Sequence, residues 1–93
     1  MAPGEMRHHN MLQVKKRAGS VVDFDIKKIE NAISRAFVAE HKSVTDDVIE
    51  LLALRVTANF NPKVTDNQIA VEDIQDSVEI VLIQAGYVSV AKS

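Results

Sequence analysis

The residues of this chain best suited to chemistry are basic side chains in its first third. Lys15, Lys16 and Arg17 stand together, and Lys27 and Lys28 follow a short distance later. Lysine supplies a compact positive charge and arginine a planar fork of donors. The N-terminus of a helix adds a positive dipole end, so these groups together can hold a di- or triphosphate. The pattern therefore predicts an anion site, provided that the fold brings the cations together.

The same cluster has a second interpretation, because exposed strands often carry lysine and arginine simply as solvated edges that discourage aggregation. Neither standard glycine-rich phosphate loop, G-x-x-x-x-G-K-[ST] or G-x-G-x-x-G, occurs in the sequence. Nucleic-acid binding fits less well, because the net charge is −2 and the cations lack neighbouring aromatic residues for base stacking. The spacing alone leaves phosphate binding and a solvated edge both open.

Residues for catalysis or metal binding are sparse. The histidines are His8, His9 and His41, with no third ligand at a suitable spacing from the first two. The sequence has no cysteine, which excludes disulfides, thiolate zinc sites and thiol catalysis. The acidic pairs at 46–47 and 72–73 are explained by compensation of helix dipoles. We therefore expect neither a catalytic nor a metal site.

The composition indicates one small domain. The chain has 93 residues, 46% of them hydrophobic and only 4% aromatic, so its core must be built mainly from Val, Ile, Leu and Ala. No apolar run approaches the roughly 18 residues that cross a bilayer, and the first ten residues lack the apolar middle of a signal peptide. We expect a soluble, cytoplasmic protein.

The strands and helices that would position these cations begin after a first segment in which apolar residues show no periodic pattern. Residues 1–11 are expected to be a flexible leader or an expression remnant, and residues 12–93 the domain. In the next segment Leu12, Val14 and Lys16 alternate with Gln13, Lys15 and Arg17, and extended character resumes over 21–24. Gly19 lies between the two stretches and tolerates the positive φ of a hairpin turn. In such a hairpin Lys16 lies on the opposite face from Lys15 and Arg17.

Helical patterns account for most of the remaining sequence. A first helix should begin after the N-cap Asp25 and run to about Glu40, and a second should begin after Thr45. Asn61-Pro62 predicts a loop over 59–67, followed by an edge strand at 69–71. A third helix should open at Glu72 and close at Gly86, and residues 87–93 should start a fourth. The predicted fold class is α+β, mainly α: about four helices, the last truncated, capped by a β-hairpin or three-stranded sheet.

The order of these segments resembles the ATP-cone domains found at the N-terminus of ribonucleotide reductase large subunits. Residues 14–37 resemble the family's V-x-K-R-x-G-x hairpin, which leads into P-F-D-x-x-K-I and an A-I-x-x-A-F helix. Residues 69–79 resemble I-T-V-E-x-I-Q-D-x-V-E, and residues 85–92 resemble the closing A-G-Y-x-x-V-A-K. The resemblance spans 12–93.

The resemblance implies a non-catalytic domain that binds ATP or dATP, together with Mg²⁺, and controls the overall activity of a parent reductase. It implies phosphate contacts from Lys16, Arg17 and Lys28 and a backbone contact from Val14. Val22, Asp25 and Val71 would line the adenine and ribose side. The family often has an acidic residue at or next to Val22 and a threonine near residues 70–71, whereas Val22, Ala70 and Val71 are apolar here.

The implied partners are an adenine nucleotide, the catalytic domain of a reductase that supplies deoxyribonucleotides for DNA replication, and other cones, with neither nucleic acid nor membrane. Two alternatives stay open. One is the cone of a transcriptional repressor of reductase genes, whose four-cysteine zinc ribbon would have to precede this segment. The other is a degenerate cone that binds no nucleotide and serves as a protein interaction surface.

Overall fold

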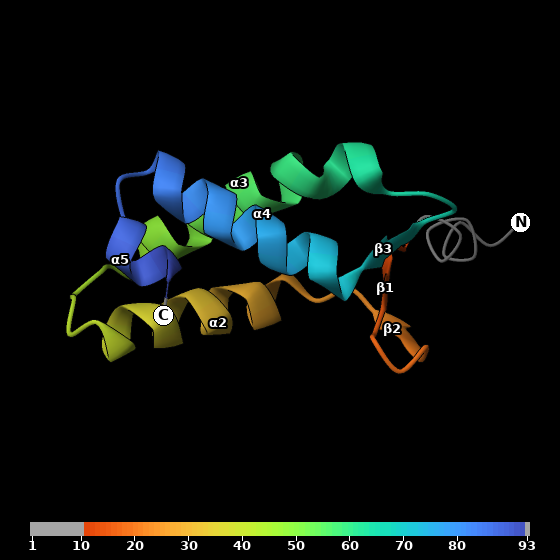
Figure 1. The fold of residues 1–93 in the computed structure, drawn as a ribbon, viewed down its shortest axis with the longest axis horizontal. Coiled ribbons are helices and arrows are strands. Elements are labelled where there is room, and N and C mark those ends of the chain that lie inside the picture. The colour runs from red at the N-terminus through yellow and green to blue at the C-terminus, as the bar shows by residue number, and fades with distance from the viewer. Residues whose placement is uncertain (1–10, 93) are drawn as a thin grey trace, which may run out of the picture.

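A computed structural model describes residues 11–92 of the chain. A small sheet lies at one end of the molecule, and three long helices extend from it toward a short helix at the other end (Figure 1). The described residues thus form an α+β fold that is mainly helical, as the sequence predicts. None of the helices in residues 11–92 is long and apolar enough to cross a membrane.

The sheet has three strands of three residues each: β1 (Gln13–Lys15), β2 (Val21–Asp23) and β3 (Gln68–Ala70). Their order is β2-β1-β3, with β1 antiparallel to β2 and parallel to β3. The hairpin turn has Gly19 at φ +96°, and the Gly19 N–H donates to the Lys16 carbonyl at 2.9 Å. The predicted hairpin and third strand are therefore confirmed.

Helix α2 (Ile26–Ala39) follows β2 after a short connection. The Asp25 side chain accepts a hydrogen bond from the Lys27 N–H at 3.0 Å, which satisfies one of the donors left open at a helix start. Ile29, Ile33 and Phe37, spaced by four residues, are buried. The predicted cap and apolar stripe are confirmed, and Glu40 is the C-cap.

Helix α3 (Asp46–Phe60) begins after Thr45, whose hydroxyl accepts from the Val48 N–H at 3.4 Å. The helix runs further than predicted, because the expected loop at 59–67 begins only after Phe60. Two interactions hold this last turn: Phe60 is fully buried, and Asn59 accepts a 2.7 Å hydrogen bond from the buried Ser77 hydroxyl. A 3-10 turn, η1 (Asn61–Lys63), contains the proline that stops the helix.

Helix α4 (Val71–Gln84) follows β3 with no intervening residue. Val71, predicted as the end of a strand, is instead the first residue of this helix. The helix ends at Gln84 with Ala85 as its C-cap, and Gly86 adopts φ +92°, the left-handed conformation predicted for it. Helix α5 (Val88–Ala91) is a single turn that lies against α2 and α4.

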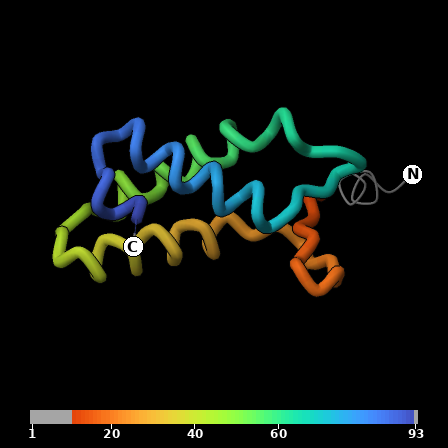
Figure 2. Tube along the Cα trace, viewed as in Figure 1, coloured from red at the N-terminus to blue at the C-terminus, as the bar shows by residue number. Residues whose placement is uncertain are grey.

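The core lies among α2, α3, α4 and the inner face of the sheet. Figure 2 shows the paths of these helices and their common approach to the sheet at one end. Aromatic rings close both of its ends: Phe24 meets Phe60 edge to face at 5.8 Å, and Phe37 meets Tyr87 at 4.9 Å. The outer side of α3 carries exposed leucines instead. The buried apolar residues are Val14, Ile29, Ile33, Phe37, Ile49, Leu52, Ala53, Val56, Phe60, Ile69, Val81, Leu82 and Val90.

Candidate functional site

A cleft of about 440 Å³ opens where the inner face of the sheet meets α2, α4 and α5. This volume falls in the range of small-molecule sites. The walls are mostly apolar, with a few charged side chains near the sheet. The lining residues are Val14, Lys16, Val22, Asp23, Phe24, Asp25, Lys28, Ile29, Ala32, Ala36, Val71, Ile74, Gln75, Val78, Glu79, Leu82, Val90 and Ala91.

Strand β1 positions Lys16 at the sheet side of the cleft. Lys16 stands two residues after Val14, so both side chains lie on the inner face of the sheet, and both line the cleft. Lys15 lies on the other face, where it lines a separate polar depression with Lys63 and Asp73. Since Lys15 pairs with Ala70 in the parallel ladder, Lys16 stands level with Val71, the first residue of α4.

Helix α2 positions Lys28 on the opposite side of the cleft. Ala32 and Ala36 follow at intervals of four residues on the same helix face and also line the cleft. Their small side chains leave the space between α2 and α4 open. Lys27, one position earlier, is exposed and does not line the cleft. Of each adjacent pair of lysines, the fold therefore places one at the cleft and the other outside it.

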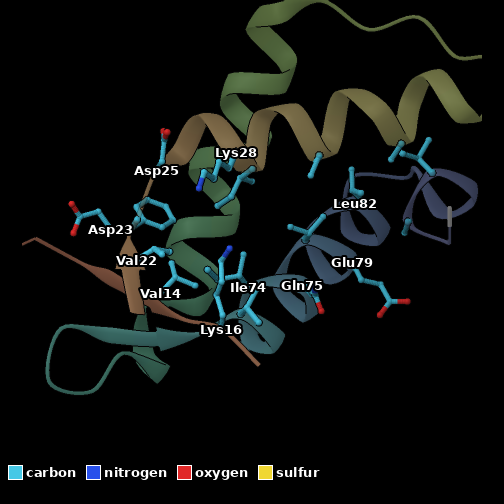
Figure 3. Close-up of a pocket in the computed structure, with 18 residues that line it drawn as sticks. Val14, Lys16, Val22, Asp23, Asp25, Lys28, Ile74, Gln75, Glu79 and Leu82 are labelled. Atoms are coloured by element: carbon cyan, nitrogen blue, oxygen red, sulfur yellow. The ribbon is translucent and has the colours of Figure 1, made fainter. Parts of the chain in front are cut away.

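The two lysines at the cleft converge. Figure 3 shows the side chains of Lys16 and Lys28 extending into the same opening from opposite sides, one from the sheet and one from α2. Three carboxylates also line the cleft, but those of Asp23, Asp25 and Glu79 point away from the two amino groups (Figure 3). The two amino groups therefore extend toward the same opening, and the carboxylates are turned away from it (Figure 3).

The start of α4 adds a third favourable feature to the cleft. No side chain caps this helix, because its N-cap position is Ala70. The first N–H groups of a helix have no partner within the helix, and together with the dipole they attract anions. Val71, the first residue of α4, lines the cleft beside Lys16. Glu72 and Asp73, in the first turn of α4, offset part of this dipole, so the free N–H groups are the main contribution of the helix start.

Arg17 has a different position. Its Nε donates to the Glu72 carboxylate at 3.1 Å, and its Nη2 donates to the Gln75 side-chain oxygen at 3.0 Å. Arg17 is not among the lining residues, whereas Gln75 is. The guanidinium therefore lies at the rim of the cleft, bound to the first two turns of α4.

The structure thus gathers most of the residues that the sequence singled out. Every predicted site residue except Arg17 lines the cleft: Val14, Lys16, Val22, Asp25, Lys28 and Val71. Their role in binding stays a prediction. Helix α4 also contributes wall residues that were not predicted from the sequence, although they follow Val71 at helical spacing. These are Ile74, Gln75, Val78, Glu79 and Leu82. Among the described residues no three His, Cys, Asp or Glu side chains gather to hold a metal, and His8 and His9 lie outside those residues.

Asp25 has two roles in this arrangement, because it caps α2 and lines the cleft. We expect Asp25→Ala to lower the free energy of unfolding by about 1 kcal/mol, the usual effect of removing an N-cap. Asp25→Asn keeps the accepting oxygen and should lower it much less. Urea denaturation of the two variants beside the parent protein measures both values, and equal losses would contradict the capping role.

The fold and the cleft define a class: a small helical domain, closed at one end by a sheet, with a mainly apolar cleft between them into which two lysines extend (Figure 3). Residues 12–93 match the model of the ATP cone domain family, and the chain belongs to this family. Domains of this family are nucleotide-binding allosteric regulators and are not catalytic. The resemblance identified in the sequence is therefore confirmed over the whole predicted domain.

Proposed function

We propose that the cleft binds ATP or dATP, with the phosphates between Lys16 and Lys28. The observation that carries this proposal is the convergence of two lysines, from separate elements, in the cleft between the sheet, α2 and α4 (Figure 3). Each ammonium group can form charge-assisted hydrogen bonds with phosphate oxygens, which are shorter and stronger than neutral ones. The first N–H groups of α4, which no side chain caps, can also donate to the phosphates, while Glu72 and Asp73 in the same turn reduce the helix dipole.

In this proposal the remaining predicted residues surround the nucleoside. Val14 and Val22 are opposite each other in neighbouring strands, and both line the cleft. They offer an apolar surface to the adenine ring, and the carboxylate of Asp25 or of the adjacent Asp23 is an acceptor for an amino or hydroxyl group. Val71 offers an apolar contact at the ribose side. Asp23 also supplies an acidic residue next to Val22, where the family often has one.

The charges of the site favour a nucleotide that carries Mg²⁺. Two lysines line the cleft, but three carboxylates lie around it, so the cleft does not neutralise a triphosphate. Mg²⁺ is commonly held by substrate phosphates with few protein ligands. The proposed ligand is therefore the magnesium complex of the nucleotide, with the metal held mainly by the phosphates.

The proposed biological role is control of a ribonucleotide reductase through this domain. ATP and dATP differ by one 2′-hydroxyl, so their phosphate contacts are nearly the same. Only a contact near the ribose can then favour one arrangement of the parent enzyme over another. A coupling of about 1–3 kcal/mol is typical of allosteric regulation. The proposed partners are the catalytic domain and other cones, in an enzyme that supplies deoxyribonucleotides for DNA replication in the cytoplasm.

Thermal unfolding with and without nucleotide tests the binding proposal. At ten times Kd, selective binding to the folded form adds about 1.4 kcal/mol to its stability. For a domain of this size we therefore expect ATP or dATP with Mg²⁺ to raise Tm by about 6–11 °C. CTP at the same concentration is the control for base recognition. If neither ATP nor dATP at millimolar concentration moved Tm or gave heat in calorimetry, the proposal would fail and a degenerate cone would be favoured.

A further inference from the structure

We propose that Glu72 sets the nucleotide affinity of the cleft by competing with the bound phosphates for Arg17. This inference rests on the proposed function, because it concerns the same anion site. It assigns a role to an acidic residue that does not line the cleft. In this role Glu72 is a positioning residue, since it acts through the arginine.

The geometry of the rim supports this competition. Arg17 follows Lys16 in sequence, and its guanidinium donates to Glu72 at 3.1 Å and to Gln75 at 3.0 Å. Gln75 lines the cleft, so the guanidinium is bound to a residue of the wall itself. A rotation of the Arg17 side chain about its own bonds can bring its donors to a phosphate held beside Lys16. Such a rotation breaks the bonds to α4.

The ion pair between Arg17 and Glu72 is exposed, and a bound ligand can break it at little cost. The Arg17 and Glu72 side chains are 70% and 50% exposed, and an exposed ion pair typically contributes only about 0–1 kcal/mol. Glu72 accepts one bond from the guanidinium, whereas a polyphosphate carries more negative charge and can accept two parallel bonds from an arginine. The pair therefore places Arg17 at the rim of the cleft and is weak enough for a polyphosphate to displace Glu72.

Removal of the competitor should increase affinity. We expect Glu72→Ala to lower the Kd for ATP about two- to fivefold, the factor that corresponds to an exposed ion pair of up to about 1 kcal/mol. Titration calorimetry with ATP and Mg²⁺ on the full 93-residue chain measures this change. Thermal unfolding without nucleotide verifies that the variant is folded, because Glu72 also compensates the dipole of α4.

The loss of one negative charge could itself favour an anion, so two controls isolate the role of Arg17. Asp76→Ala removes the charge of another exposed acid on α4 that does not line the cleft, and it should change the Kd much less. Glu72→Ala is also made in an Arg17→Ala background. There the gain should disappear, because no arginine is left to release. The Arg17 Nε–H resonance offers a direct readout, since it should shift when ATP is added.

The outcomes distinguish the inference from the function on which it rests. If the parent protein binds ATP and Glu72→Ala leaves the Kd unchanged, the competition is wrong and the nucleotide site stands. A gain that persists in the Arg17→Ala background, or that Asp76→Ala reproduces, also overturns the inference, because the effect then comes from general charge. If the parent protein binds no ATP, both proposals fail. A gain that requires Arg17 supports the inference.

Discussion

Replacement of Lys16 and Lys28 together by alanine should weaken ATP binding by a factor of about 10²–10⁴. The two side chains enter one cleft from opposite sides, and a hydrogen bond to a charged group contributes about 1.5–3 kcal/mol. Each single substitution should therefore weaken binding roughly tenfold or more. Titration calorimetry with ATP and Mg²⁺ measures these Kd values.

The chain provides a matched control for this prediction. Lys15 and Lys27 are the neighbours of the two site lysines, and neither lines the cleft. The variant Lys15→Ala/Lys27→Ala removes the same number of charges from adjacent positions, so it measures the general effect of net charge. It should bind ATP within a few fold of the parent protein, particularly at physiological ionic strength, where exposed charges are screened. Equal losses in the two double variants would exclude the cleft as the phosphate site.

Phe60→Ala should lower the free energy of unfolding by about 3–5 kcal/mol, the usual result of removing a buried phenylalanine ring. Phe60 is 0% exposed at the end of α3, and its ring meets Phe24 edge to face. Because small domains have little stability in total, this loss leaves the variant largely unfolded at ordinary temperatures. Urea denaturation followed by circular dichroism measures the change.

Leu54→Ala is the matched control, because it removes a large apolar side chain from the same helix at a position that is 58% exposed. It should change the free energy of unfolding by no more than about 0.5 kcal/mol. A comparable loss in the two variants would show that the outer side of α3 is covered in solution. Phe24 also lines the cleft, so any Phe60→Ala protein that remains folded should bind ATP less tightly.

The elements with strong local signals could be predicted from the sequence. Asp25 and Thr45 each stand where a cap is needed, and the structure shows both capping bonds. Gly86 adopts the predicted positive φ. The end of α3 could not be predicted in the same way. Local composition favours a loop from Asn59, but the helix continues because of burial of Phe60 and a bond to Ser77, which is far away in sequence.

In the candidate site, too, some features follow from the local sequence, and others depend on contacts between distant segments. Alternation in a strand separates Lys16 from Lys15, so the face of each could be predicted. Parallel pairing of β1 with β3, which brings α4 beside Lys16, depends on a contact between distant segments. For this reason the sequence could not show that Arg17 reaches Glu72 and Gln75, more than fifty positions away.

The direct passage of β3 into α4 has a mechanical consequence. Since no residue separates Ala70 from Val71, a displacement of β3 has no loop in which it can be absorbed before α4, and β1 is paired with β3 along its whole length. In the binding mode proposed above, a ligand that drew Lys16 toward Lys28 would pull on β1 and, through β3, on the start of α4. The C-terminal half of α4 carries the exposed side chains of Ile80 and Ile83, so a movement of the whole helix would change the position of this apolar surface.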